Sequence, residues 1–123
     1  MAVDIRNYLD VLEGFSDEIK SEVNVAMHSW YPDAVPVTYL FGLIGSALAD
    51  VFPKLTESER RSLFNHIEQG VLADDEAFST AVATGLLEGI VGKASQTDRR
   101  WDEIEPYLED ESRIYITAWT NLG

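Results

Sequence analysis

The sequence predicts an all-α fold, a single compact domain over residues 1–123 built as a bundle of about five to six helices. Three observations predict it. Apolar residues recur at three- and four-residue intervals, the spacing of one helix face. The segment 37–52 is apolar over about half of a helix circumference and carries small residues on the rest, as expected of a central helix buried on both sides. No second strand is evident to pair with 113–117, the segment with the most strand-like composition.

The N-terminal region 3–29 is interpreted as one bent helix or two consecutive helices. A break is expected at 14–16, because Ser16 followed by two acidic residues is typical of a helix start. Residues 30–36 are expected to form a loop, since each of its two prolines restricts the residue before it. The buried stripe of this region consists of Ile5, Tyr8, Leu9, Leu12, Phe15, Ile19, Val23, Met27 and Trp30.

The central helix is expected to cross the helix at 75–91 with an unusually short distance between the two backbones. Glycine inside a helix costs about 1 kcal/mol relative to alanine, so a row of small residues indicates close packing. Such residues lie on both helices, and we expect the contact to form within the chain. They are Gly42, Gly45, Ser46 and Ala49 on the first helix, and Ala77, Ala81, Gly85 and Gly89 on the second.

The remaining helices are predicted from their ends. Thr56 and Glu59 fit a capping box that begins a helix with its buried stripe over 63–71. Asp74 or Asp75 is expected to cap the helix at 75–91, and 92–97 to form a polar connector. Asp98 is expected to begin a short helix that Pro106 disturbs. The segment 112–122 fits a helical face, and we interpret it as a helix.

Composition limits the classes of function. The chain has 22 acidic and 9 basic residues and a net charge of −13, spread over its whole length. Such a field repels nucleic acid and anionic membranes and favours a basic partner, although it also serves solubility alone.

The absence of cysteine excludes disulfides and thiolate chemistry. Asp4 and Arg6 argue against a signal peptide, and 37–52 is too short and too interrupted to span a bilayer. We therefore expect a soluble, cytoplasmic protein.

Few residues suggest catalysis. His28 and His66 have no partner at metal-ligand spacing, and neither a phosphate-binding loop nor a nucleophile elbow is present. Glu68 and Glu88 would form an acid/base pair with raised pKa values if they met. The favoured alternative is that each carboxylate pairs with Arg60, with Arg61 or with a free backbone N–H. We expect no enzyme activity, no cofactor and no metal.

Three acidic clusters with neighbouring aromatic residues are candidate partner-binding sites. Exposed aromatic side chains supply buried area and acids attract a basic protein, although the same residues also suit helix caps and solvated faces. The first cluster comprises Trp101, Asp102, Glu103, Glu105, Tyr107, Glu109, Asp110 and Glu111; the second comprises Asp74, Asp75 and Glu76; the third comprises Tyr31 and Asp33.

In size, helical pattern and acidity the chain resembles bacterial immunity proteins, the inhibitors made beside polymorphic or contact-delivered toxins. The segments Leu63–Glu68 and Thr84–Glu88 are also similar to those of small bacterial proteins of this kind. The resemblance implies stoichiometric binding, in which an acidic face covers the active site of a basic toxin domain. The alternative is an acidic adaptor or nucleic-acid-mimicking regulator, from a phage or a bacterium, that binds a basic host protein.

Overall fold

The computed structural model describes residues 4–96 and 99–122, with side chains up to Thr120. All regular structure in these ranges is helical, which confirms the all-α prediction. The elements are α1 (Ile5–Glu13), α2 (Asp17–Trp30), α3 (Val37–Val51), η1 (Phe52–Lys54), α4 (Glu57–Val71), α5 (Glu76–Ala81), η2 (Val82–Leu87), α6 (Glu88–Ala94), α7 (Arg100–Ile104), η3 (Glu105–Tyr107) and α8 (Asp110–Leu122). The π-helical turn η2 joins α5 to α6, so the described residues form seven main helices, more than the five to six predicted.

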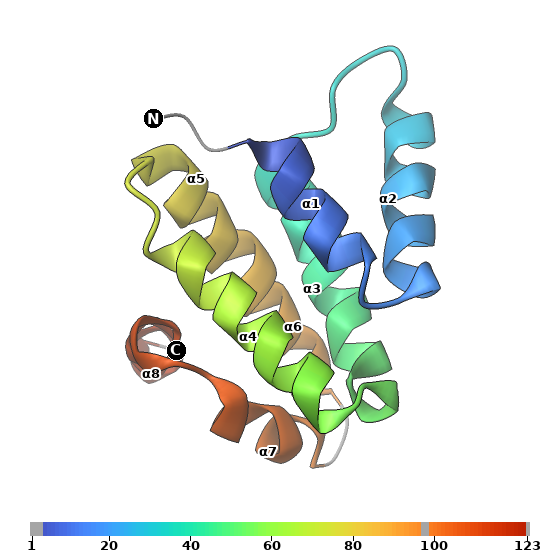
Figure 1. Ribbon diagram of the computed structural model, residues 1–123. Coiled ribbons are helices and arrows are strands. Elements are labelled where there is room, and N and C mark those ends of the chain that lie inside the picture. Colours follow the sequence, from blue (N-terminus) through green and yellow to red (C-terminus); the bar gives the residue numbers. More distant parts are fainter. Residues whose placement is uncertain (1–3, 97–98, 123) are drawn as a thin grey trace.

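The helix α3 lies in the middle of the fold. It packs against α2 on one side and against η2 and α6 on the other. In Figure 1, α1 crosses in front of α3, while α7 and α8 lie along the lower edge. Phe41, Ile44 and Leu48 of α3 are all buried in the hydrophobic core. The central buried helix expected at 37–52 is therefore confirmed.

The helix starts follow the local sequence. The Ser16 hydroxyl accepts a hydrogen bond from the backbone of α2, so the break expected at 14–16 separates α1 from α2. Thr56 and Glu59 form the predicted capping box of α4. Asp75 is the residue that caps α5, through a 3.1 Å bond from the Phe78 N–H. The cap expected at Asp98 lies outside the described residues, and 112–120 belongs to the helix α8, as predicted.

The predicted close crossing is present between α3 and the continuous helix α5–η2–α6. A Cβ atom added to Gly45 would lie 2.5 Å from the carbonyl oxygen of Leu86. A Cβ on Gly85 would lie 2.6 Å from the Cβ of Phe41, and one on Gly89 would lie 2.7 Å from the carbonyl oxygen of Gly42. Real Cβ atoms do not approach other atoms so closely, so only glycine allows the two backbones to touch.

The π-helical turn lies within this crossing and was not predicted. One extra residue in a turn rotates all later side chains about the helix axis. The position of Glu88 therefore could not be derived from a uniform α-helical projection of 75–91. The helix also continues to Ala94, past the expected end, because Val91 and Ala94 are buried against the core.

We expect Gly45→Ala to lower the free energy of unfolding by about 1–3 kcal/mol, because the new methyl group forces the two helices apart. Gly42→Ala, one turn earlier on α3, is the matched control, since its Cβ would meet nothing within 4 Å. That variant should be as stable as the wild type or up to about 1 kcal/mol more stable. Urea unfolding followed by circular dichroism measures both, and equal stability of the two variants would contradict the close crossing.

Candidate functional site

The first predicted cluster forms one corner of the molecule, which we call the acidic corner and define as residues 101–111. It is built from α7, η3 and the start of α8 (Figure 1). Arg100 fixes α7 by donating a 2.5 Å hydrogen bond to the Ala49 carbonyl at the end of α3. Asp102 and Glu103 lie in the first turn of α7, and two further acids lie in that of α8. Acids are stabilised there by the positive end of the helix dipole.

Most carboxylates of the acidic corner lack a counter-charge. Glu105 pairs with Arg113 at 2.8 Å. Within the part of the chain that the structure describes, no salt bridge or side-chain hydrogen bond holds the other five carboxylates. They belong to Asp102, Glu103, Glu109, Asp110 and Glu111. The corner is therefore a local concentration of carboxylates, most of which have no directly paired cation among the described residues.

The two aromatic residues of the acidic corner are less exposed than the sequence suggested. Trp101 and Tyr107 are half-buried and pack against the core. The Tyr107 ring centroid lies 5.4 Å from that of Phe52, and its hydroxyl donates to the Glu57 carboxylate. Because α7 and η3 are short, they pack against the hydrophobic core through these two aromatic side chains. Only the exposed edges of the two rings remain for a partner.

The other two predicted clusters lie at separate corners. Asp74, Asp75 and Glu76 connect α4 to α5, where Asp75 serves as the cap already described. Tyr31 and Asp33 lie in the loop that follows α2. Figure 1 places the start of α5, the end of α2 and the helix α7 far from one another. The three clusters therefore do not form one continuous acidic face.

Glu68 has a structural role that the sequence analysis had named as the favoured alternative. Its side chain is buried, and its Oε1 accepts hydrogen bonds from the Ser112 N–H at 2.9 Å and the Ser112 hydroxyl at 2.7 Å. Its Oε2 accepts the Glu111 N–H at 2.8 Å. The carboxylate of α4 thus caps the N-terminus of α8, which satisfies N–H groups that have no partner within their own helix.

Glu88 also binds α8, through a hydrogen bond from the Tyr115 hydroxyl. Burial, together with this bond to a carboxylate, raises the pKa of Tyr115 to about 12. The expected arginine partners are engaged elsewhere. Arg60 lies over the Phe52 ring at 4.4 Å, and Arg61 pairs with Glu57 at 2.8 Å. Neither arginine partners Glu68 or Glu88, so that part of the prediction was wrong.

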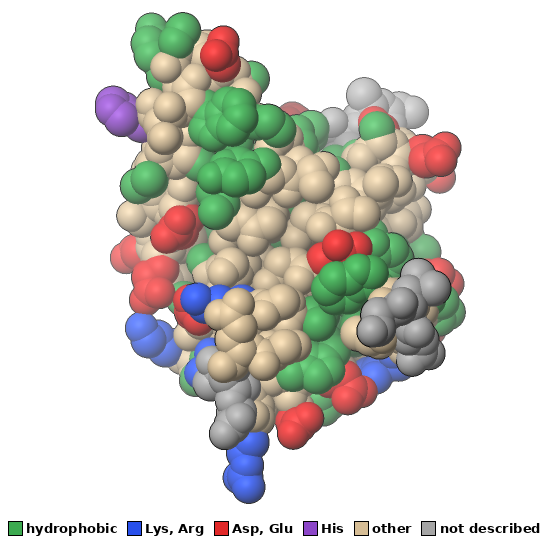
Figure 2. All heavy atoms as spheres, turned by 180° about the vertical axis from the view of Figure 1, so that it is seen from behind, with side chains coloured by type: hydrophobic (Ala, Val, Ile, Leu, Met, Phe, Trp, Pro, Cys, Tyr) green, Lys and Arg blue, Asp and Glu red, His purple; other side chains and the backbone are tan. Residues whose placement is uncertain are grey.

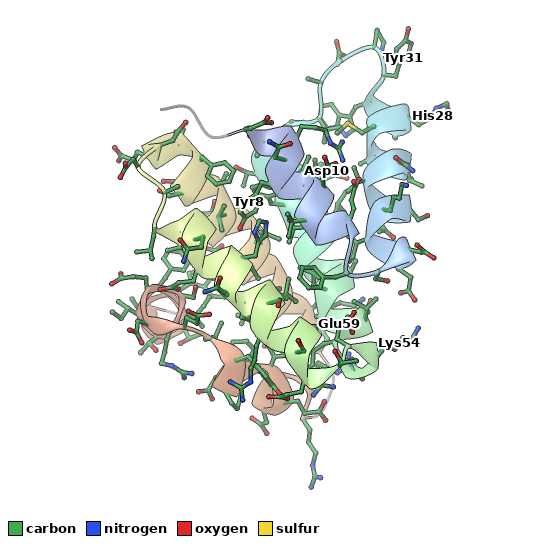
Figure 3. The ribbon with its side chains drawn as sticks, in the orientation of Figure 1. Tyr8, Asp10, His28, Tyr31, Lys54 and Glu59 are labelled. Carbon is green, nitrogen blue, oxygen red and sulfur yellow. The ribbon has the colours of Figure 1, made fainter. Side chains whose placement is uncertain are left out.

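The two histidines lie in different environments. His28 is exposed on α2 and points away from the body (Figure 3). His66 is half-buried and stacks on Tyr8, with ring centroids 3.9 Å apart. The Tyr8 hydroxyl donates to the His66 carbonyl at 3.0 Å, and His66 Nε2 lies 3.1 Å from the Tyr8 carbonyl oxygen. This reciprocal contact joins α1 to α4, and burial lowers the pKa of His66. In the described ranges, no group of three acidic or histidine side chains is placed to hold a metal ion.

A surface of which the sequence analysis named only Tyr31 as a contact residue lies where α2 ends and α3 begins. We call it the aromatic patch and define it as Met27, Trp30, Tyr31 and Tyr39, whose exposed fractions are 40%, 38%, 80% and 50%. Met27 and Trp30 were expected in the buried stripe, but they continue that stripe beyond the part of α2 that the core covers. Figure 2 shows hydrophobic side chains gathered over this end of the molecule.

A comparison of the chain with protein families, curated proteins and solved structures finds no match. Among the described helices, none combines the length and the apolar character that crossing a bilayer requires.

We expect Glu68→Gln to lower the free energy of unfolding by about 1–3 kcal/mol, because an amide cannot accept all three hydrogen bonds and leaves a buried donor unsatisfied. Amide hydrogen exchange should show that protection is lost first in α8. Glu22→Gln, an exposed position on α2, is the control and should change stability by less than about 0.5 kcal/mol. Unchanged stability and unchanged protection of α8 in Glu68→Gln would contradict the anchoring role.

We expect His66 to make stability fall as the pH is lowered. The pKa of His66 is below its ordinary value of 6.5 in the folded chain, so the unfolded chain takes up the proton first. The stabilising contribution of neutral His66 is fully present above pH 6.5. It is lost as the pH falls through the pKa that His66 has in the folded chain. Urea unfolding between about pH 7.5 and pH 5.5 should show a larger loss for the wild type than for His66→Gln. The carboxylates titrate in both proteins and cancel in the difference, so parallel curves would disprove the assignment.

Proposed function

We propose that this chain is a stoichiometric inhibitor of the immunity-protein type, which binds a basic toxin domain in the cytoplasm and covers its active site. The observation that carries the proposal is the acidic corner, where five of the six carboxylates form no ion pair among the described residues. A partner that supplies lysine or arginine side chains would complete these pairs.

The physical basis is electrostatic attraction followed by rigid docking. Complementary charge speeds the encounter of two proteins and selects the orientation in which they meet. The half-exposed edges of Trp101 and Tyr107 would add apolar contact beside the charges. Because Glu68 and Arg100 fix the backbone on both sides of the corner, its shape exists before binding. A preformed surface loses less conformational entropy on association than a flexible one.

The positions of Glu68 and Glu88 also favour a binding role for this region. These are the two carboxylates that the sequence offered for acid/base chemistry, and both hold α8 in place. Glu68 contacts the last residue of the acidic corner, Glu111, and Glu88 contacts α8 at Tyr115, beyond the corner. The alternative of an acidic adaptor or nucleic-acid mimic uses the same charge against a different basic protein, and the identity of the captured partner distinguishes the two.

The proposal is tested by affinity capture with tagged protein from its native cells at low and at moderate salt. We expect one stoichiometric basic partner that is released as salt rises, and whose enzymatic activity is blocked at a one-to-one ratio. Asp102→Asn/Glu103→Gln should weaken the complex about two- to thirtyfold, the range for two exposed ion pairs.

Asp17→Asn/Glu22→Gln is the matched control, because it removes two exposed acids from α2, one of them also in a first helical turn. Both variants change the net charge from −13 to −11, so a loss confined to the first one identifies the corner. Equal losses in the two variants would assign the effect to total charge. Capture of a nucleic-acid-binding host protein would support the alternative, and no partner at either salt concentration would contradict both functions.

A further inference from the structure

The aromatic patch has features of a site for cationic side chains. Trp30 and Tyr39 come from different helices, with ring centroids 5.8 Å apart and planes inclined by 51°. Tyr31 extends from the loop beside them and points away from the body (Figure 3). Indole and phenol rings attract a lysine or arginine cation that lies over their faces. An arginine gains more, since its planar guanidinium also stacks on the ring.

The charge around the patch has the sign that a cation requires. Between residues 23 and 49, Asp33 is the only acidic residue, lysine and arginine are absent, and Asp33 lies two residues from Tyr31. The 14-residue helix α2 ends at Trp30 and directs the negative end of its dipole toward this loop. The start of α3 contributes the opposite partial charge, and Asp33 adds the one acidic side chain of this segment.

We propose that the aromatic patch is a second contact surface for the basic partner, and that it binds arginine side chains on the exposed faces of its aromatic rings beside Asp33. This inference rests on the proposed function, because it assigns a further site to the same class of partner. A second copy of this chain is a poorer occupant, because each copy carries a net charge of −13 and would bring Asp33 against Asp33.

The test uses the full chain, labelled with ¹⁵N, and a capped hexa-arginine peptide as the probe, with hexalysine for comparison. At physiological salt, we expect the amide signals of residues 27–39 to shift in a saturable manner, more strongly with arginine than with lysine. Tyr31→Ala and Tyr39→Ala should each weaken binding at this site about two- to fivefold. Tyr31→Phe keeps the ring and should bind as the wild type does. Leu72→Ala removes an apolar side chain at the end of α4 that is about as exposed as Tyr39, and it should not change the affinity for the peptide.

The location of the shifts separates this inference from the proposed function. Shifts confined to 101–111 would overturn the inference and leave the acidic corner as the binding surface. Shifts confined to 27–39 would support the inference and count against the corner. Absence of shifts at both would contradict both, and unchanged affinity in Tyr31→Ala and Tyr39→Ala would overturn the role of the rings. A dimer seen by analytical ultracentrifugation, and lost in Tyr31→Ala/Tyr39→Ala, would assign the patch to a second copy and overturn the inference as well.

Discussion

The close contact between α3 and the continuous helix α5–η2–α6 is the constraint on which the other elements depend. Three glycines, at positions 45, 85 and 89, let the two backbones touch. Phe41 and Ile44 on one helix and Leu86 on the other then form the core that the remaining helices cover. The helix α2 packs on the outer side of α3, and α4 packs on η2. Glycine destabilises a helix relative to alanine, and the burial of large apolar groups at the crossing offsets this cost.

The helix α8 is positioned differently, by polar groups rather than by close backbone contact. Ile116 enters the core, but the N-terminus of α8 is fixed by the buried carboxylate of Glu68 and its side by Glu88. A buried carboxylate is tolerated there because hydrogen bonds and the positive end of a helix dipole replace its hydration. The acidic corner ends at Glu111, whose backbone N–H is one of the groups that Glu68 caps. The acids in the first turn of α8 therefore lie at the positive end of its dipole, beside a carboxylate that already serves as its cap.

Local features of the fold could be predicted from the sequence, whereas features that depend on distant residues could not. Helical periodicity, the Thr56–Glu59 cap and the four-residue spacing of Gly85 and Gly89 are all contained in short segments. The partner of Glu68 lies more than forty residues away along the chain, and the π-helical turn lies in contact with a separate helix, α3. Periodicity also shows which residues share a face without showing how far that face is covered. For this reason Trp30 was expected inside and lies half outside, while Trp101 was expected outside and lies half inside.

The two proposed surfaces differ in the distance over which they act. The field of the acidic corner extends over about 8 Å at physiological salt, so it would act on a partner before contact and would control chiefly the rate of association. Stacking on Trp30, Tyr31 and Tyr39 would require contact and would be much less sensitive to salt, so it would control chiefly the lifetime of the complex. Because α7 and the end of α2 lie at opposite ends of the molecule (Figure 1), one partner would have to extend along the whole body to reach both.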